Sequence, residues 1–393
     1  MKSPFQFSVA KVFKALGMTA LALLLSMFMM QPFAFSTTAL LSSHEKKDFK
    51  ITDFYNIVAE SRAVRQLDDN VVIVNIDNAD RADIASLIDQ LAIYEPAAIG
   101  LDVTFDSPRD SLVDDYLISV IEASPRIVQA VTVNPLGNSV RPDCFTVGER
   151  SFFMDSASLS TPGCPAPAVG AVNLPMKMAG GVAREFAVKY STPDSTLVIP
   201  SFPAALAAMV DSAAHADLLA RGNDLETIYY PSRIYREWDA TDVDLHADEI
   251  RGRVVLIGAL DDLGDKHASP LGHAISGVEI HARALSTILD RNYVTATPGW
   301  FNILAGAFVT FLFLLLYVTF VVPWKAIVLR ILQVVVLYLI LVISYRLFIG
   351  SNILVDFSFT FLMVTFGLFA FDIWTGGESL VDYLGKKITG RRS

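Results

Sequence analysis

One apolar run sets the pattern for the folded part of this chain: Val71-Val72-Ile73-Val74-Asn75-Ile76-Asp77. An apolar run that ends at a carboxylate is typical of a buried strand in an α/β sheet. Residues 81–94 follow, with apolar side chains three and four residues apart from Ile84 to Leu91, which is the spacing of a helix. The stretch therefore predicts a strand followed by a helix.

The same alternation continues along the chain. Residues 97–103 and 127–133 read as further strands, and residues 114–123 read as the helix between them. Alternating strands and helices imply a parallel sheet with helices on its faces. We therefore predict an α/β fold for this region, with a mostly parallel sheet and flanking helices.

The second half of the region adds elements of the same kinds. We predict a helix over residues 200–214, a buried strand over 253–258 and, after the segment 277–281, an amphipathic helix over 282–289. Residues 134–199 are more irregular. Because no repeat and no low-complexity linker interrupts the region, we expect one domain over residues 38–298.

The composition of the whole chain indicates a membrane protein. Of its 393 residues, 53% are hydrophobic and only 18% are charged, whereas soluble chains carry about 25% charged residues. Since about 20 apolar residues cross a bilayer as a helix, four stretches are long enough: residues 15–35, 300–322, 326–348 and 353–374. The net charge of −10 argues against a nucleic-acid-binding protein, which normally has a basic face.

Basic residues set the predicted orientation in the membrane. Lys2, Lys11 and Lys14 lie before the first apolar stretch, and positive charge favours the cytoplasmic side. Four crossings then return the tail, residues 375–393, to the cytoplasm. We therefore expect residues 1–14 and the tail inside and the large domain outside. A cleaved signal peptide is the alternative for the first stretch, although its apolar run exceeds the usual length of about 7–15 residues.

The chain has two cysteines, Cys144 and Cys164. Both lie in the part that we predict to be exported, where disulfides form, and the segment between them is rich in Ser, Pro and Gly. We therefore expect a disulfide that closes a loop of about 20 residues and contributes about 3 kcal/mol to stability. Two free thiols are the alternative.

An ordered set of short motifs resembles a known family. The set comprises Ile76-Asp77, Ile99-Gly100-Leu101-Asp102-Val103-Thr104-Phe105, Gly170-Ala171-Val172-Asn173, Gly181-Val182-Ala183-Arg184, Gly252-Arg253-Val254-Val255-Leu256-Ile257-Gly258, Leu263-Gly264-Asp265 and Gly277-Val278-Glu279-Ile280-His281-Ala282. Their order over residues 53–297 resembles the type-2 CHASE domain, an extracytoplasmic sensor attached to bacterial cyclases and histidine kinases. The resemblance implies a multi-pass protein of the bacterial inner membrane with a periplasmic domain that binds an unknown small ligand.

Two features depart from the pattern of that family. Many members carry a Trp/Pro/Arg-containing segment after the first strand, whereas here Asp77 is followed at once by Asn78-Ala79-Asp80-Arg81. Members also commonly continue into a cyclase, kinase or phosphodiesterase domain, whereas this chain ends about 19 residues after Trp374. The resemblance therefore implies a sensor whose output comes from a separate cytoplasmic effector, such as a cyclase, a kinase or a protease.

Carboxylates gather at the ends of the predicted strands. Asp77, Asp102 and Asp106 lie at or just beyond two of them, and Asp261 and Asp265 follow a later one. Open α/β sheets bind ligands at the carboxyl ends of their strands. We therefore expect these five residues to bind a cation or another polar ligand. The alternative is that the carboxylates cap the helices that follow.

Metal binding and catalysis receive less support. Asp265, His267 and His281 are metal-compatible residues, but their spacing matches no standard zinc motif, and a buried, hydrogen-bonded His281 is the alternative. The sequence has no Gly-x-Ser-x-Gly elbow, no His-Glu-x-x-His motif and no Walker loop. We therefore expect no catalytic residue, no cofactor and no enzyme activity. A structural scaffold and an extracytoplasmic hydrolase are the rival functions.

The tail offers a docking face for a partner. Leu380, Val381 and Leu384 form a small apolar group beside basic residues. We expect Gly376-Gly377 to interrupt the helix that leaves the membrane, because glycine is a poor helix former. Binding of the basic residues to anionic lipids is the alternative to partner docking, and the sequence leaves the homo-oligomeric state open.

Overall fold

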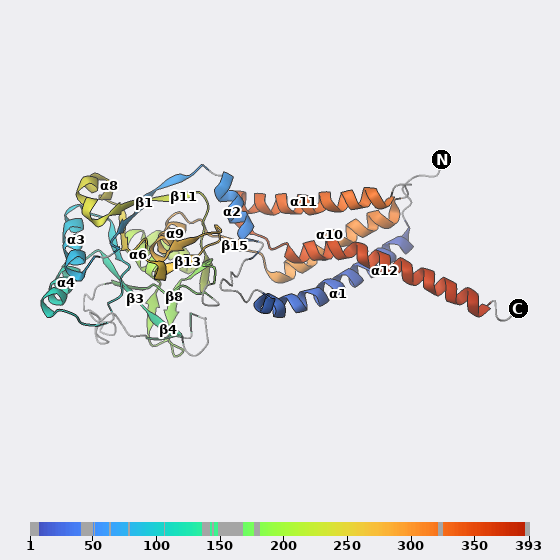
Figure 1. Cartoon of the computed structure of the whole chain (residues 1–393), viewed down its shortest axis with the longest axis horizontal. Helices are drawn as coiled ribbons and strands as arrows, with labels where there is room; N and C mark the ends of the chain where they lie inside the picture. The colour runs from blue at the N-terminus through green and yellow to red at the C-terminus, as the bar shows by residue number, and fades with distance from the viewer. Residues whose placement is uncertain are drawn as a thin grey trace. The chain divides into compact units, whose positions relative to one another are not determined.

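The computed structural model describes residues 8–40, 50, 52–62, 64–77, 79–105, 107–135, 142–143, 145–147, 168–176, 181–320 and 325–389. The chain divides into two compact units (Figure 1). One unit comprises Lys47–Val294 and contains the central sheet. The other combines Met1–Lys46 with Thr295–Ser393 and contains four long apolar helices.

A six-stranded parallel sheet lies at the centre of the first unit. Its strands are β1 (Gln66–Asn75), β2 (Ala98–Leu101), β3 (Ile127–Val131), β6 (Ala168–Ala171), β11 (Arg233–Asp239) and β12 (Val254–Gly258). They lie in the order β11-β1-β12-β2-β3-β6, and every neighbouring pair is parallel. The predicted α/β fold with a mostly parallel sheet is therefore confirmed.

Helices cover both faces of this sheet, and short strand pairs complete the unit. The helices are α2 (Asp53–Arg62), α3 (Arg81–Ile93), α4 (Ser111–Ala123), α6 (Phe202–Val210), α7 (Ser212–Ala220), α8 (Ala247–Ile250) and α9 (Gly277–Leu289), with 3-10 turns η1 (Ala240–His246) and η2 (Leu263–Asp265). The antiparallel pairs are β4 (Val133–Pro135) with β5 (Phe145–Val147), β7 (Glu185–Ala187) with β10 (Leu225–Thr227), β8 (Lys189–Ser191) with β9 (Val198–Pro200), and β13 (Lys266–Ala268) with β14 (Ala274–Ser276).

Alternate residues of β1 pack into two different cores. Val71 and Ile73 belong to the core that also contains residues of α6, α7 and α9. Val72 and Val74 belong to the core that contains residues of α3 and α4. Successive side chains of a strand face opposite sides of a sheet, and here both sides are covered. This double burial explains why the run is apolar without alternation.

The predicted helix over residues 200–214 is two helices in the structure. Helix α6 ends at Val210, and α7 begins at Ser212. Asp211 between them has an extended backbone, and its carboxylate accepts hydrogen bonds from the backbone N–H groups two and three residues further on, at 3.0 and 2.9 Å. The prediction of one helix is wrong because this aspartate caps α7 instead of continuing α6.

Four long helices form the second unit. They are α1 (Val9–Leu40), α10 (Gly299–Thr319), α11 (Lys325–Ser351) and α12 (Ser358–Thr389), and the two-residue strands β15 (Thr295–Ala296) and β16 (Ile353–Leu354) pair in parallel. Each of the four helices contains a span that is long and apolar enough to cross a membrane. The prediction of one amino-terminal and three carboxy-terminal membrane helices is therefore confirmed.

Helix α12 continues past Gly376-Gly377. We expected these glycines to end the helix, and that prediction is wrong, since α12 runs without a break to Thr389. A glycine costs a helix only about 1 kcal/mol, and side chains hold this turn together. Trp374 Nε1 donates to Glu378 Oε1 at 2.8 Å, and Glu378 also forms an ion pair with Lys14 of α1.

Candidate functional site

The carboxyl ends of β1, β12 and β2 meet at one edge of the sheet, which we call the carboxyl edge. Strand β1 leads to α3 on one face, whereas β12 leads towards α9 on the other. Neighbouring parallel strands whose connections leave to opposite faces open a crevice at their carboxyl ends, where α/β proteins commonly bind ligands. Asp106, Cys144 and Cys164 lie outside the described residues; Asp77, Asp102, Asp261 and Asp265 are described and follow these strands.

Asp77 and Asp261 form the exposed part of the carboxyl edge. The backbone N–H of Asp261 donates to Asp77 Oδ1 at 3.4 Å, and Lys266 Nζ lies 3.5 Å from Asp261 Oδ1. Asn75 Oδ1 accepts the N–H groups of Asp77 at 3.3 Å and of Leu260 at 3.0 Å. Side chains at the end of β1 therefore hold the segment that follows β12, so the two strand ends are tied together.

A surface hollow of about 580 Å³ lies beside Asp77. Its polar lining residues are Asn75, Asp77, Asp83, Ser86, Gln90, Asp239 and Thr241, and its lining includes no lysine or arginine. Small-ligand sites typically have volumes of about 300–1,000 Å³. The hollow therefore has the size and the negative charge to hold a small polar molecule next to the carboxyl edge.

Asp102 and Asp265 form the inner part of the carboxyl edge. Burial, together with the nearby Asp265 carboxylate, raises the pKa of Asp102 to about 7. Within the described part of the chain, no residue donates a hydrogen bond to the Asp102 carboxylate. Asp265 Oδ2 accepts the backbone N–H of Gly277 at 3.2 Å, in the first turn of α9. Asp265 thus lies at the start of α9 and contributes to the raised pKa of Asp102.

Two histidines flank Asp265. His267 Nε2 lies 3.2 Å from Asp265 Oδ1. His281 is only 4% exposed and packs edge-on against Phe202, with ring centroids 5.4 Å apart. Burial lowers the pKa of His281 to about 4, against the opposing effects of Asp265 and of a hydrogen bond with the Val172 backbone. The ring is therefore neutral near pH 7, as expected for a buried, hydrogen-bonded histidine.

The geometry gives the predicted metal site no support. Asp265 and His267 are in contact, and His281 is close enough to both to feel their charges. In the described ranges, however, no three or more His, Cys, Asp or Glu side chains are grouped so that they could hold a metal ion. Metal binding by Asp265, His267 and His281 therefore stays a prediction.

A buried ion pair fixes the helices beside the carboxyl edge. Arg81, at the start of α3, pairs with Asp114 of α4 and donates to the Ser107 carbonyl at 2.6 Å, and its guanidinium lies over the Phe105 ring. A hydrogen bond from the Arg109 backbone N–H, together with the Arg81 guanidinium, holds the pKa of Asp114 below its ordinary value. These contacts tie α3 to α4 and to the segment that follows β2.

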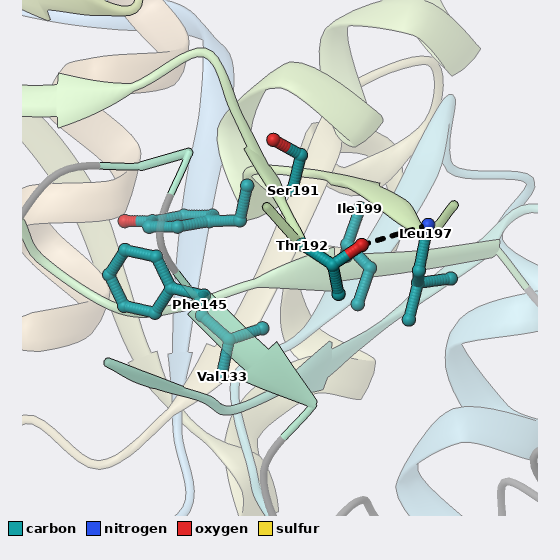
Figure 2. A pocket seen from close by; sticks show the side chains of 7 residues that line it. Val133, Phe145, Ser191, Thr192, Leu197 and Ile199 are labelled. Carbon is teal, nitrogen blue, oxygen red and sulfur yellow. Dashed lines mark hydrogen bonds between the residues drawn. The ribbon is translucent and has the colours of Figure 1, made fainter. Parts of the chain in front are cut away.

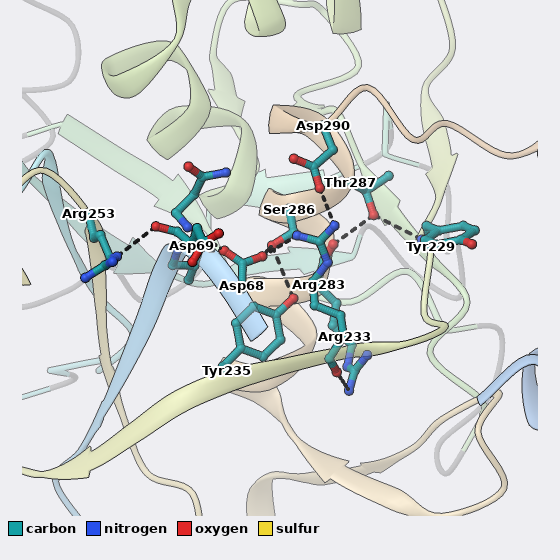
Figure 3. A network of polar contacts seen from close by, with 12 residues as sticks. Asp68, Asp69, Tyr229, Arg233, Tyr235, Arg253, Arg283, Ser286, Thr287 and Asp290 are labelled. Carbon is teal, nitrogen blue, oxygen red and sulfur yellow. Dashed lines mark hydrogen bonds and ion pairs between the residues drawn. The ribbon is translucent and has the colours of Figure 1, made fainter. Parts of the chain in front are cut away.

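A buried polar network joins β1, β11 and α9 near the amino-terminal part of β1 (Figure 3). Asp68 accepts a hydrogen bond from Ser286 Oγ at 2.7 Å and pairs with Arg233, which also pairs with Asp290 after the end of α9. Tyr235 OH donates to Ser286 Oγ at 3.2 Å. We did not predict this network. Its one sequence signal is Asp68, which lies three residues before the apolar run, because a charge next to a buried strand requires partners when it is itself buried.

A mostly apolar pocket lined by residues of β4, β5, β8 and β9 is too small for an organic ligand (Figure 2). Its lining includes Phe145, Tyr190 and Ile199, and its volume is about 10 Å³, roughly that of one water probe. Phe145 and Tyr190 pack edge to face, with ring centroids 4.9 Å apart. This region is therefore part of the packing between the small strands and not a second binding site.

Comparison with known proteins supports the resemblance seen in the sequence. A family model described as the CHASE2 domain matches residues 21–320. The match covers most of the chain, including the central sheet and the carboxyl edge. No curated protein and no solved structure matches this chain.

Proposed function

Because the chain belongs to the CHASE2 domain family, a family of sensory extracellular domains, we propose that it is a membrane sensor that works with a separate effector. The domain Lys47–Val294 binds a small ligand at the carboxyl edge of its sheet. The membrane helices relay the bound state to the cytoplasmic side, where a separate protein produces the output. The family supports a sensory role in place of a catalytic one.

Helix α9 carries this proposal. It begins at the carboxyl edge, where the Gly277 N–H binds Asp265, and it ends at Leu289. The membrane helix α10 begins about ten residues later in the chain, at Gly299. A ligand that binds one of two α9 positions more tightly shifts the population towards that position, and packed helices respond by small rigid shifts. Asp68 and Arg233 contact Ser286 and Asp290 near the carboxy-terminal end of α9. These hydrogen bonds and ion pairs can differ between the two positions of the helix.

The orientation in the membrane is part of the proposal. Lys11 and Lys14 lie at the start of α1, and Lys386 and Lys387 lie in the last turn of α12. Positive charge at these ends favours a cytoplasmic location for both, which leaves the sensor domain in the periplasm. A reporter that is active only outside the cytoplasm is expected to work when fused after Tyr235 and to fail when fused after Lys387. The reverse pattern would contradict the orientation.

The relay is tested by measuring the cytoplasmic end while the sensor domain is altered. Lys14 and Glu378 are in contact between α1 and α12, so the double variant Lys14→Cys/Glu378→Cys reports on this helix pair through its crosslinking rate in native membranes. Measured at pH 8, where Asp102 with its pKa of about 7 is mostly ionised, Asp102→Asn removes this charge from the carboxyl edge with little change in the size of the side chain. We expect it to change the crosslinking rate at least about two-fold, a small shift in the balance between two states.

The matched control is Asp115→Asn. Asp115 is exposed on α4 and is not one of the carboxylates of the carboxyl edge, and this variant is expected to leave the crosslinking rate unchanged. Equal rates in the unaltered sensor domain, in Asp102→Asn and in Asp265→Asn, all in correctly inserted protein, would contradict a relay from the carboxyl edge. A rate that changes equally with Asp115→Asn would show a non-specific effect of lost charge and would also contradict it.

A further inference from the structure

We propose that the strand pair β15–β16 couples the sensor domain to α12, so that the state of the domain reaches the cytoplasmic side through this helix. This inference rests on the proposed sensing function and adds the path by which the signal leaves the domain. It is carried by hydrogen bonds on both sides of one peptide bond, between Val294 and Thr295. Along the chain, one compact unit ends and the other begins at this bond.

The first observation is that the chain is held within the sensor domain up to the last residue of that unit. After the end of α9, the backbone N–H groups of Arg291 and Asn292 donate to carbonyls of the last turns of the helix, at 3.1 and 3.0 Å. Val294 is buried and forms an antiparallel bridge with Thr227 of β10. A displacement of the carboxy-terminal end of α9 is therefore passed on to Val294 with little slack.

The second observation is that the chain is held in the membrane unit from the next residue onwards. The backbone N–H of Thr295 donates to the Asn352 carbonyl at 2.8 Å, and that of Thr297 donates to the Leu354 carbonyl at 2.9 Å. The Thr297 hydroxyl also donates to Asn302 Oδ1 at 2.8 Å. Strand β15 and the residue after it are therefore bound to the segment between α11 and α12 and to the first turn of α10.

The segment that pairs with β15 leads directly into α12. Asn352, after the end of α11, has a left-handed backbone with a φ of 52°, a conformation that commonly ends helices. Only three residues separate Leu354 from α12. Of these, Val355 is buried, and the Asp356 carboxylate accepts the backbone N–H of Ser358 at 3.0 Å. Because this connection is short and held in place, a shift of β16 is passed to the start of α12.

Helix α12 is long and continuous enough to carry such a shift to the other end of the membrane unit. It runs without a break from Ser358 to Thr389, and the part from Ser358 to Glu378 alone spans about 30 Å. It packs closely against α10, since a Cβ on Gly306 would lie 3.2 Å from Thr360 Cα. Packed helices move by small rigid shifts, so we expect α12 and α10 to move together against α1.

The small size of the strand pair suits a coupling that has two arrangements. Strands β15 and β16 contain two residues each, and an isolated pair of strands is only marginally stable in water. Its hydrogen bonds therefore define one position of the helices, yet they can be exchanged when the sensor domain favours another position.

The test measures the Lys14→Cys/Glu378→Cys crosslinking rate of the full-length protein in native membranes. Thr295→Pro removes the N–H that donates to Asn352, and Thr297→Val removes the hydroxyl that donates to Asn302. Each is expected to change the rate at least about two-fold. The matched controls Thr295→Val, which keeps the N–H, and Thr297→Ser, which keeps the hydroxyl, are expected to leave the rate unchanged. Unchanged rates in Thr295→Pro and Thr297→Val, or equal changes in their controls, would overturn the proposal.

An insertion keeps the test decisive if a β15 variant inserts poorly into the membrane. Gly-Ser-Gly between Val294 and Thr295 leaves the hydrogen bonds on both sides possible but adds slack to the connection. In this variant Asp102→Asn, measured at pH 8, is expected to lose its effect on the crosslinking rate. The same tripeptide between the exposed residues Gly222 and Asn223 is expected to preserve that effect. An effect that survives the insertion after Val294 would indicate another route, such as the connection between α1 and α2, and would overturn the proposal.

The outcomes also separate this inference from the proposed function. If Asp102→Asn and Asp265→Asn leave the crosslinking rate unchanged while Thr295→Pro and Thr297→Val change it, the coupling through β15–β16 stands and the relay from the carboxyl edge fails. If the two aspartate variants change the rate and the two threonine variants do not, the relay stands and the coupling through β15–β16 fails.

Discussion

Ser286 of α9 donates its hydroxyl hydrogen to Asp68 Oδ2 of β1 at 2.7 Å, and both side chains are buried. Asp68 Oδ1 also accepts the backbone N–H groups of Asn70 and Val71, each at 2.8 Å, and the carboxylate pairs with Arg233. One carboxylate therefore fixes the turn before the apolar run, the neighbouring strand and the last helix before the membrane.

Asp68→Asn is expected to lower the free energy of unfolding by about 2 kcal/mol, because it removes the buried carboxylate that pairs with the partly buried Arg233 and accepts from Ser286. Ser286→Ala removes one hydrogen bond to a charged acceptor and is expected to cost about 1–2 kcal/mol. Thermal unfolding of the full-length protein measures both. Ser119→Ala, which removes an exposed hydroxyl on α4, is the matched control. Equal melting temperatures for Ser286→Ala and Ser119→Ala would contradict the role of the network.

Asp102 is expected to make stability fall with rising pH. Its pKa is raised to about 7 from 3.8, so between pH 4 and 7 the folded protein holds a proton that the unfolded chain has released. The stability that it contributes is complete below pH 4 and is lost as the pH rises through 7. The melting temperature of Asp102→Asn relative to the unaltered protein should therefore increase from pH 4 to pH 7. The increase is expected to be about 10 °C, because three pKa units correspond to about 4 kcal/mol and each kcal/mol to about 2–4 °C in a domain of this size.

His281 is expected to have the opposite effect and to make stability rise with rising pH. Its pKa is lowered from 6.5 to about 4, so the unfolded chain binds the extra proton between pH 4 and 6.5, and stability is lost as the pH falls through this window. The melting temperature of His281→Gln relative to the unaltered protein should therefore decrease from pH 4 to pH 6.5. Parallel pH profiles of the two variants would contradict one of the two assignments.

Replacement by alanine is expected to reduce stability at one glycine and to change it little at another. A Cβ on Gly170 of β6 would lie 2.4 Å from Phe202 Cα, and backbone atoms of a packed helix cannot yield. Gly170→Ala is therefore expected to cost about 3 kcal/mol. At Gly277 the obstructing atoms belong to the partly exposed Asp265 carboxylate, which can rotate away, so Gly277→Ala should change the melting temperature by less than about 2 °C, with helix propensity acting in its favour. A similar loss in both variants would contradict this difference.

The contact between α1 and α12 depends on the absence of a side chain at Gly17. A Cβ there would lie 2.5 Å from the Trp374 ring. Gly17→Leu should separate the helices and reduce Lys14→Cys/Glu378→Cys crosslinking at least about five-fold, since interfaces of membrane helices rely on small residues for close approach. Leu16→Ile, at a half-exposed neighbouring position, should leave crosslinking unchanged. Crosslinking that Gly17→Leu does not reduce would contradict this packing.

The disulfide stays a prediction that protein chemistry can test directly. Cys144→Ser should lower the melting temperature if Cys144 and Cys164 are joined, because the reduced chain gains loop entropy when it unfolds, worth about 3 kcal/mol. Mass spectrometry under non-reducing conditions should find the linked pair in protein recovered from its native compartment. Two free thiols there would contradict the prediction.

Local patterns in the sequence were sufficient for the element types and for the membrane helices. The apolar run before Asn75 predicts a strand that is covered on both faces. In a strand with one exposed face apolar and polar side chains alternate, whereas in a strand buried on both faces they do not. The apolar stretches of α10 and α11 predict membrane helices, because a helix of their length is as long as the hydrocarbon core of a bilayer is thick. The low helix propensity of glycine led to the wrong prediction that the helix ends at Gly376-Gly377. In the structure, contacts of Trp374 and Glu378 stabilise the helix there.

The tertiary structure alone decided which side chains meet. Strand β12 lies between β1 and β2, although it follows both by more than a hundred residues in the chain, and this order brings Asp265 to Asp102. The sequence placed each carboxylate after a strand but contained no information on which strands are neighbours, since pairing depends on packing between distant segments. For the same reason the partners of Asp68 and the burial of His281 against Phe202 were not predictable, because burial and hydrogen bonding are properties of the folded surroundings and not of the residue.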